Sequence, residues 1–273
     1  MPERFACFDN DGTLWCERPR YIQFEFFLDA LRGAIETTPG LADTPEFAAL
    51  IARDQTALDE LGLKRVALAL AGLFKGHTAE EYRSTVRQFM ASARHPEFER
   101  PMDQLRYRPM LELIEELRAL AFTVALVSGG GVEFVRSVSD DLYGIPSELV
   151  AGTRIAYDFR RQEDGAPLLT RTARVDGDVD EGPAKVVTIQ SQLGRRPILA
   201  AGNSGGDREM LEWAAGSDGP SLAILVNHDD ADREYAYVSK AASFSEDRPI
   251  TEVGADLGWT VVSMKEDWAD VFA

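Results

Sequence analysis

Short apolar runs alternate with amphipathic stretches along most of this chain. The runs contain few polar residues, which is typical of strands buried on both faces of a sheet. The predicted strands lie at residues 5–8, 123–127, 149–151, 197–201, 221–226 and 259–263. Between them, apolar residues recur every three or four positions, as in a helix with one buried face. This alternation predicts an α/β fold, in which a parallel sheet carries helices on both faces.

One stretch, residues 16–104, departs from this alternation and contains no convincing strand. Its apolar residues recur at helical spacing, and Thr78 with Glu81 has the form of a capping box, which begins a helix. We therefore predict an all-helical insertion after the first strand. The predicted helices cover residues 21–35, 47–61, 63–74 and 79–90. Farther along, residues 155–159 and 168–175 flank an Asp-Gly turn and predict a β-hairpin.

The composition indicates a globular protein of one large or two modest domains. Of its 273 residues, 45% are hydrophobic, which is enough for a sizeable core. The net charge of −17 argues against a nucleic-acid partner and against an anionic membrane surface. No apolar run approaches the roughly 18 residues of a membrane span, and we expect no signal peptide before the first strand. With two cysteines, Cys7 and Cys16, both expected to be inert, we predict a cytoplasmic protein.

Two acids at the end of the first predicted strand carry the strongest chemical signal. Asp9 and Asp11 follow the apolar run, and Gly12 after them can adopt the positive φ of a tight turn. Buried carboxylates are costly unless they are paired or bind a metal, so this pair predicts a nearby cation. An isolated Asp-x-Asp-Gly also occurs as a simple turn, in which the acids only shape the backbone.

Other polar residues follow later strands in the same way. Ser128 and three glycines come between a strand and a helix, an arrangement that presents backbone N–H groups to an anion. Asn203 and Asp207 follow another strand. Lys185 occupies the third position of a predicted helix, where a cation opposes the helix dipole. Because parallel strands end at one edge of the sheet, we expect these side chains to meet there.

Together these motifs resemble the haloacid dehalogenase superfamily of aspartate-nucleophile hydrolases. Residues 9–13 match its first motif and Ser128 its second. Lys185 matches the third motif, and residues 202–207 match the acidic fourth. The resemblance covers residues 5–210, with the four motifs in the family's order.

The resemblance also implies how the chain is divided. Residues 1–15 and 105–273 would form a Rossmann-like catalytic core, and residues 16–104 a helical cap. A hairpin followed by Lys185 is similar to the phosphoserine-phosphatase-like branch of the superfamily. The expected substrate is a small phosphorylated metabolite, because a cap of this size leaves little space for a macromolecule.

In such an enzyme the acids have distinct roles. Asp9 would attack phosphorus and form an aspartyl-phosphate, while Asp11 would act as general acid and then as general base. Mg²⁺ would be held by Asp9, by the backbone carbonyl of Asp11, and by Asn203 or Asp207.

Two kinds of group would bind the phosphate in such an enzyme. Ser128 and Lys185 would stabilise the charge on the transferring phosphoryl oxygens. The segments around Gly12, Thr13 and Gly129 would contact the same oxygens through the backbone.

One departure from the family pattern concerns the metal. Many relatives carry an acid where this chain has Asn203, and an amide oxygen can bind Mg²⁺ but brings no charge. We therefore expect Asp207 to contribute more of the balancing charge, with a lower metal affinity. Asp11 favours phosphate esters, since relatives that cleave carbon–halogen bonds typically lack this second acid.

Four residues outside the motifs are further candidates for a place at the site. Arg18 and Arg20 lie where the core passes into the cap, so either could bind an anionic group of the substrate. For His228, which two aspartates follow, we expect an exposed turn. For His77 we expect a surface position in the cap.

The sequence therefore predicts a Mg²⁺-dependent phosphomonoester hydrolase. Phosphoryl transfer and dehalogenation on the same scaffold are the first alternatives. A catalytically silent phosphate-binding protein is another. The physiological substrate and the oligomeric state are not predicted.

Overall fold

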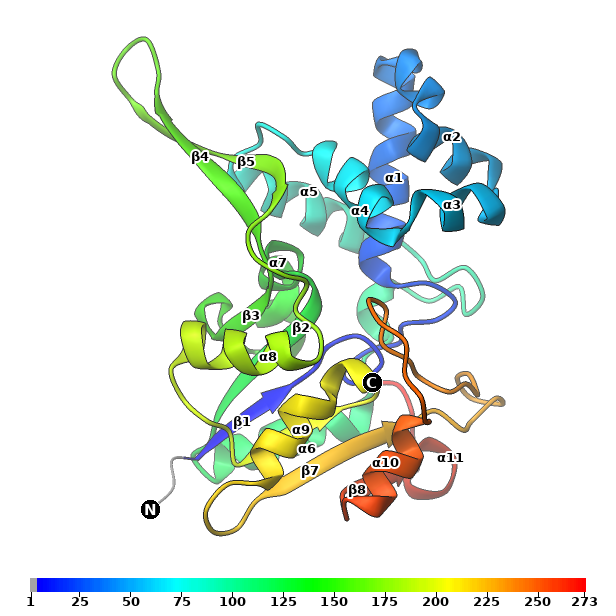
Figure 1. The fold of residues 1–273 in the computed structure, drawn as a ribbon, viewed down its shortest axis with the longest axis vertical. Helices are drawn as coiled ribbons and strands as arrows, with labels where there is room; N and C mark the ends of the chain where they lie inside the picture. Colours follow the sequence, from blue (N-terminus) through cyan, green and yellow to red (C-terminus); the bar gives the residue numbers. More distant parts are fainter. Residues whose placement is uncertain (1–3) are drawn as a thin grey trace.

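The computed structural model describes residues 4–273. Within this range six strands form one sheet, and every neighbouring pair in it is parallel, in the order β3-β2-β1-β6-β7-β8. The strands are β1 Phe5–Phe8, β2 Thr123–Gly131, β3 Val150–Thr153, β6 Leu199–Gly202, β7 Leu222–Asn227 and β8 Thr260–Ser263. The predicted parallel α/β fold is therefore confirmed (Figure 1).

The strand order places the first strand near the centre of the sheet. The chain passes from β1 to β2 and β3 on one side, and then returns to β6, β7 and β8 on the other. Phe8 at the end of β1 is in register with Leu126 of β2 and Ala201 of β6. The strand order therefore reverses between β1 and β6. The carboxyl ends of these two strands form the switch point at which open α/β sheets bind ligands.

Helices cover both faces of the sheet. The buried side chains of β1 alternate between two hydrophobic clusters. One cluster includes residues of α6 and α7, and the other includes residues of α9 and α10. The helices of this part are α6 Arg108–Ala119, α7 Val132–Tyr143, α8 Pro183–Thr188, α9 Arg208–Ala215, α10 Ile250–Asp256 and α11 Met264–Asp267. The hydrophobic pattern does not predict α10 and α11, which are too short to show a clear period.

The predicted insertion consists of helices and irregular segments, without a strand in its described residues. Its α-helices are α1 Ile22–Thr37, α2 Pro45–Ala52, α3 Gln55–Leu61, α4 Leu63–Gly72 and α5 Ala79–Ser92. The single helix predicted over residues 47–61 is wrong. Arg53 has a left-handed backbone conformation (φ 54°) that ends α2, and the Asp54 side chain then caps α3. Thr78 and Glu81 form the expected capping box at the start of α5.

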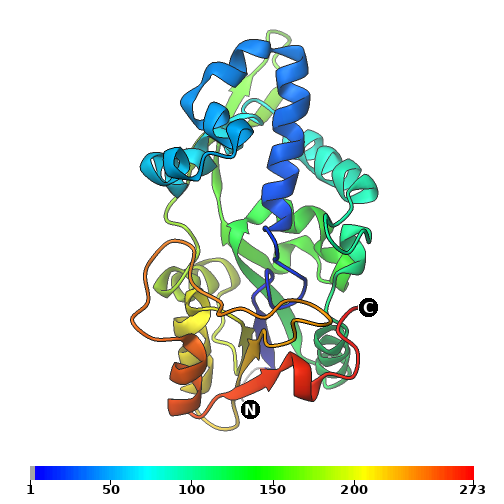
Figure 2. The ribbon, with the colours of Figure 1, turned by 90° about the vertical axis from the view of Figure 1, so that its right-hand side faces the viewer.

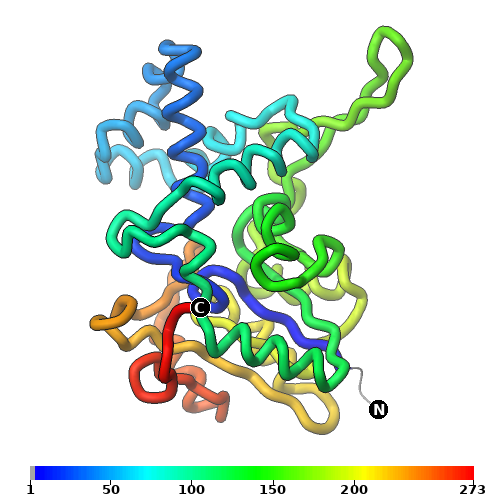
Figure 3. Tube along the Cα trace, turned by 180° about the vertical axis from the view of Figure 1, so that it is seen from behind, coloured from blue at the N-terminus to red at the C-terminus, as the bar shows by residue number. Residues whose placement is uncertain are grey.

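The predicted hairpin is formed by β4 (Ile155–Arg161) and β5 (Pro167–Val175), which pair antiparallel. It extends away from the sheet on the same side as the five helices (Figures 1 and 3). Arg171 anchors it, because its guanidinium pairs with Glu133 of α7 at 3.0 Å and lies 3.8 Å from the ring centroid of Tyr82 in α5. Among the described residues, no helix is both long enough and apolar enough to cross a membrane.

Candidate active site

The turn after β1 brings Asp9 and Asp11 to the switch point. The N–H of Asp9 donates to the carbonyl of Ala201 at the end of β6, at 2.9 Å, so Asp9 prolongs the sheet ladder by one residue. Gly12 has a φ of +72°, a left-handed conformation that favours glycine. A Cβ atom on Gly12 would also lie 2.0 Å from the side-chain nitrogen of Asn203, so the turn needs glycine for space as well.

Lys185 joins the acids of two strand ends. Its Nζ donates to Asp9 Oδ1 at 2.6 Å, to Asp207 Oδ1 at 2.7 Å and to the carbonyl of Val127 at 2.8 Å. Burial favours the neutral amine, but the charges of Asp207 and Asp9 outweigh burial and raise the pKa of Lys185. Lys185 is therefore an ammonium group at neutral pH, and it supplies one positive charge to this end of the sheet.

Asp207 binds Lys185 through one oxygen and the loop after β6 through the other. Its Oδ2 accepts hydrogen bonds from the N–H groups of Asn203 and Ser204, each at 3.0 Å, and from the Ser204 hydroxyl at 3.2 Å. Since Oδ1 is bound to Lys185, both oxygens of Asp207 are engaged. A metal bound directly by Asp207 would share these oxygens with the donors already present, and the metal role of Asp207 stays a prediction.

Two oxygens at the switch point have only a weak hydrogen-bond donor. Asp9 Oδ2 and Asn203 Oδ1 each lie 3.4 Å from the hydroxyl of Thr13, and a hydroxyl carries a single hydrogen. Burial and the charge of Asp207 raise the pKa of Asp9 well above its usual range, although Lys185 opposes them. More positive charge is therefore needed at these two oxygens.

The available donors decide which cation fits there. Within residues 4–273, no three His, Cys, Asp or Glu side chains are grouped so that they could hold a metal ion. A metal would therefore have at most two such side chains, with the amide oxygen of Asn203 and main-chain carbonyl groups as further donors. An all-oxygen set that leaves room for water suits Mg²⁺, which keeps several waters when it binds to proteins.

Asp11 lies close to Asp9 but in a different environment. Trp15 Nε1 donates to Asp11 Oδ1 at 2.8 Å, and the Ser128 hydroxyl lies 3.5 Å from Oδ2. Burial raises the pKa of Asp11, and the hydrogen bonds from Trp15 and Asn10 only partly oppose that effect. A carboxyl group with a raised pKa retains its proton closer to neutral pH, which a general acid requires.

The glycines after Ser128 contact the helical insertion. The loop predicted there is wrong, because β2 continues through Gly131 with a register shift after Ser128, and α7 begins at the next residue. The Ser128 hydroxyl accepts a hydrogen bond from the N–H of Gly130 at 3.0 Å. The side chain of Gln23 in α1 accepts one from the N–H of Gly131 at 2.8 Å. The carbonyl of Gly129 accepts a hydrogen bond from Thr153, whose hydroxyl lies 2.7 Å away. The position of α1 therefore affects access to the glycines that we expect to bind an anion.

A buried polar network lies behind the turn, and the sequence analysis missed it. His228 is 3% exposed, with Nε2 2.8 Å from the carbonyl oxygen of Gly12 and its ring stacked on Tyr237 at 4.4 Å between centroids. Glu17 accepts hydrogen bonds from the Tyr237 hydroxyl at 2.7 Å and from the Asn203 amide at 3.2 Å. The exposed turn expected at His228 is therefore wrong, because its ring is enclosed between the turn after β1 and Tyr237.

Glu234 connects this network to the core of the protein. Its Oε1 accepts hydrogen bonds from the Tyr107 hydroxyl at 2.9 Å and from the Cys16 thiol at 3.1 Å, and its Oε2 lies 3.3 Å from Nδ1 of His228. One signal could have identified part of the network. Glu17 directly follows an apolar stretch, residues 14–16, that is almost fully buried.

The other candidates from the sequence lie in different places. The guanidinium of Arg18 is 4.1 Å from the ring centroid of Tyr237, and its Nε is buried without a hydrogen-bond partner. Arg20 is exposed and pairs with Glu25 of α1 at 2.5 Å. His77 is only partly exposed, within the insertion. Of the two arginines, Arg18 is therefore the one that contacts the buried network.

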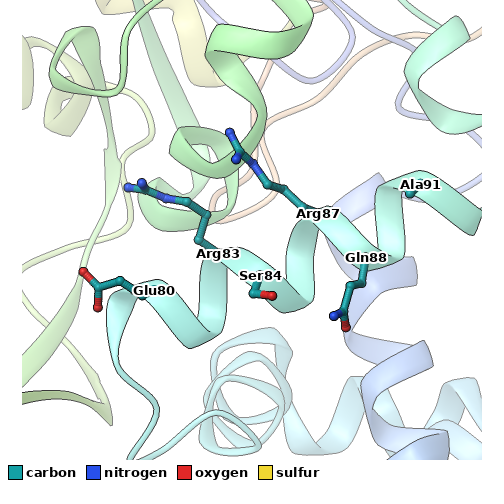
Figure 4. Close-up of a pocket in the computed structure, with 6 residues that line it drawn as sticks. All are labelled: Glu80, Arg83, Ser84, Arg87, Gln88 and Ala91. Atoms are coloured by element: carbon teal, nitrogen blue, oxygen red, sulfur yellow. The ribbon is translucent and has the colours of Figure 1, made fainter.

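A surface hollow on α5 lies apart from the strand ends (Figure 4). Arg87 in this hollow is already engaged, with the carbonyl of Ser137 and with Asp141, each at 3.1 Å. None of the residues that converge at the switch point lines the hollow, so it is not the candidate site. Its lining residues are Glu80, Arg83, Ser84, Arg87, Gln88 and Ala91.

Comparisons with known proteins agree with the family suggested by the motifs. The family model of haloacid dehalogenase-like hydrolases matches residues 6–212 of this chain. A search of the curated proteins found no match.

Two solved structures share the fold over most of the chain. A protein of unknown function from Bordetella pertussis Tohama I is 19% identical, with a TM-score of 0.59, over 96% of this chain and 99% of that one. A functionally unknown protein from Anaerococcus prevotii DSM 20548 is 16% identical, with a TM-score of 0.54, over 84% and 80% of the two chains. At these identities the likeness concerns the fold alone.

Proposed function

Because this chain belongs to the haloacid dehalogenase-like hydrolases, we propose that it is a Mg²⁺-dependent phosphomonoester hydrolase that forms an aspartyl-phosphate. The observation that supports this proposal best is the pair of acids after β1. Asp9 is held by Lys185 through one oxygen and has only a weak donor at the other. Asp11 has a raised pKa and is the partner suited to move a proton.

The proposed first step is attack by the Asp9 carboxylate on phosphorus, with departure of the alcohol. Asp11 gives its proton to the leaving oxygen, which avoids release of an unstable alkoxide. Lys185 keeps the Asp9 carboxylate in place, and its charge stabilises the negative charge that builds up on the phosphoryl oxygens. In the second step Asp11 accepts a proton from the water that hydrolyses the aspartyl-phosphate.

Mg²⁺ bound to Asp9, Asn203 and the backbone carbonyl of Asp11 would supply positive charge next to the transferring phosphoryl group. Asp207 balances charge in this proposal through Lys185 and the loop after β6. Ser128, together with the backbone near Gly129, binds the phosphoryl oxygens.

The helical insertion, residues 16–104, acts in this proposal as a cap over the strand ends. Its α1 already contacts the glycine end of β2 through Gln23, so a movement of α1 would open or close the way to these glycines. Arg18 is the arginine that we propose for an anionic group of the substrate, because its Nε is buried and lacks a partner. A small phosphorylated metabolite fits such a cap.

Phosphate release from a panel of phosphomonoesters tests the proposal. The panel is assayed with Mg²⁺, with a chelator, and with the variants Asp9→Asn and Asp29→Asn. Asp29 is exposed on α1, so Asp29→Asn is a matched control. We expect turnover that requires Mg²⁺ and falls on the order of a thousandfold or more in Asp9→Asn only. Folded protein that binds Mg²⁺ and releases no phosphate from any ester would contradict the proposal.

Product analysis separates the proposal from its alternatives. Release of halide from an added haloacid, without phosphate release from the esters, would indicate dehalogenation, for which Asp11 has no leaving oxygen to protonate. Transfer of phosphate to an added alcohol in place of water would indicate a phosphotransferase.

A further inference from the structure

We infer that Glu17 is a positioning residue that fixes the orientation of the Asn203 side-chain amide. It keeps the amide nitrogen turned away from Asp9, so that the amide oxygen faces the proposed metal position. Position 203 carries an amide where many relatives carry an acid, and Glu17 supplies an acid on the side of this amide that faces away from Asp9. The inference rests on the proposed Mg²⁺ site and adds a residue that lies outside the four motifs named above.

The two ends of the Asn203 amide have different surroundings. The nitrogen Nδ2 lies 3.2 Å from Glu17 Oε1, 3.2 Å from the Ser239 hydroxyl and 3.5 Å from Nε2 of His228. The oxygen Oδ1 has the Thr13 hydroxyl at 3.4 Å as its neighbour. An amide carries a donor at one end and an acceptor at the other, so its surroundings decide which end faces Asp9.

Of the three groups around the amide nitrogen, Glu17 is the one that requires a donor. The hydroxyl of Ser239 can donate or accept, so it permits either orientation. The Nε2 of His228 lies 2.8 Å from the carbonyl of Gly12, and a carbonyl only accepts, so this nitrogen uses its hydrogen there. Glu17 Oε1 already accepts from the Tyr237 hydroxyl at 2.7 Å, and an amide oxygen in place of Nδ2 would face another acceptor.

The packing leaves Glu17 no alternative position nearby. Only 7% of its surface is exposed, and Tyr237 holds its carboxylate from one side. A Cβ atom on Gly12 would lie 2.9 Å from Glu17 Cδ and 2.0 Å from Asn203 Nδ2. Glycine at position 12 therefore lets the carboxylate and the amide approach each other against the turn.

The same geometry explains why an amide suits position 203 here. An aspartate there would place a carboxylate oxygen about 3 Å from Glu17, and two buried carboxylates at this distance repel strongly. A glutamine at position 17 could instead donate to the Asn203 oxygen, and the amide could then rotate its nitrogen toward Asp9. Positions 17 and 203 are thus complementary: one of the two should be an acid and the other an amide.

The decisive experiment is an exchange of the acid between the two positions. The Kd for Mg²⁺ is measured by calorimetric titration of folded wild-type protein, Glu17→Gln, Asn203→Asp and the double variant. We expect Glu17→Gln to weaken Mg²⁺ binding by about tenfold or more, as loss of a group that orients a metal ligand does. The double variant should bind at least as tightly as wild type, because the amide introduced at position 17 can then donate to the carboxylate introduced at position 203. Glu163→Gln at the exposed hairpin tip is the control and should leave the Kd unchanged.

Two milder variants keep the test valid if Glu17→Gln does not fold. Tyr237→Phe removes only the hydrogen bond that holds Glu17 and should weaken Mg²⁺ binding by about threefold. Ser239→Ala removes a hydroxyl that can pair with either end of the Asn203 amide, and it should change the Kd for Mg²⁺ by less than about twofold. Thermal unfolding of each variant establishes that the folded state is being titrated.

The outcomes separate this inference from the proposed function. Unchanged Mg²⁺ affinity in Glu17→Gln, or a double variant as weak as the weaker single variant, would overturn the inference while wild-type phosphatase activity stands. A wild-type protein that binds no Mg²⁺ would overturn both. A double variant that binds Mg²⁺ more tightly than Asn203→Asp alone supports the inference whether or not a substrate is known, because loss of a nearby acid would otherwise weaken the binding of a cation.

Discussion

Glu234 shows how one buried acid is kept charged in this protein. Burial acts to raise the pKa of Glu234, but the hydrogen bond and charge of His228, with the other hydrogen bonds, outweigh burial. These other bonds come from Cys16 and from the N–H of Tyr235, so the pKa of Glu234 is below its usual value. Since the charged form is favoured by folding, Glu234 stabilises the native state whenever it is ionised in both states.

The sign of this effect predicts a pH dependence of stability. A lowered folded pKa contributes stability above the unfolded value of about 4, and this contribution is lost as the pH falls through the folded value. We expect Glu234→Gln to lower the free energy of unfolding by about 1–3 kcal/mol at pH 7, and by less below pH ~4. Urea unfolding across this range measures the difference, with Glu163→Gln as an exposed control. A deficit of equal size at every pH would show that the charge of Glu234 is not involved.

At the scale of elements, the turn after β1 needs glycine for two reasons, its backbone conformation and its close tertiary contacts. Its glycine, Gly12, has a positive φ, and its missing side chain leaves space for Asn203 and Glu17. The glycine at position 33 differs, because it lies in α1 where an added Cβ would meet nothing within 4 Å. The same substitution should therefore have opposite effects in the two elements.

Alanine substitutions at these two glycines test that contrast. Gly33→Ala should raise the free energy of unfolding by about 0.4–1 kcal/mol, because alanine reduces the freedom of the unfolded chain and suits a helix. Gly12→Ala should lower it by about 1 kcal/mol or more, since alanine is strained at positive φ and collides with Asn203. Chemical denaturation measures both. A Gly12→Ala variant as stable as wild type would show that the turn can relax without cost.

At the scale of the whole molecule, the site is completed by a segment that follows the part matched by the family model. That model ends at residue 212, yet His228, Tyr237 and Ser239 come from the chain after β7. The segment after β7 crosses the region between the sheet and the start of α1 (Figure 2). Glu181, before α8, holds it there by accepting hydrogen bonds from the N–H groups of residues 242 and 243. Members of the family with a different C-terminal part would therefore have different groups behind the proposed metal position.

The net charge of −17 predicts a salt effect on the proposed reaction. A phosphomonoester is an anion, so the negative charge of the protein repels it before it reaches the site. Salt screens this long-range repulsion, because the Debye length is only about 8 Å at physiological ionic strength. We expect kcat/KM to rise by about threefold between low and physiological ionic strength at saturating Mg²⁺, with kcat unchanged. Steady-state kinetics in a salt series measures this change. A fall in kcat/KM would indicate that the cations proposed for the site, Arg18 and Lys185, dominate the approach of the substrate.

The amino-acid sequence by itself determined the parallel sheet, the hairpin and the absence of strands in the described part of the insertion. These follow from the period of apolar residues, which reports whether a face is buried. It also placed Asp9 and Asn203 directly after strand ends, and parallel strands bring their ends to one edge of the sheet. Ser128 was expected to follow a strand but lies within β2, which continues through Gly131. The break between α2 and α3 was not predictable, because Arg53 adopts a conformation that its residue type disfavours.

Only the tertiary structure decided which polar groups face one another. Periodicity reports burial but not the identity of a partner, and the contacts that define the site join distant parts of the chain. Lys185 meets Asp9 across 176 positions, and Asn203 meets Glu17 across 186. His228 was expected to be exposed because a histidine followed by two acids resembles a surface turn. Its burial depends on the stacking with Tyr237 and on the carbonyl of Gly12, neither of which a local pattern contains.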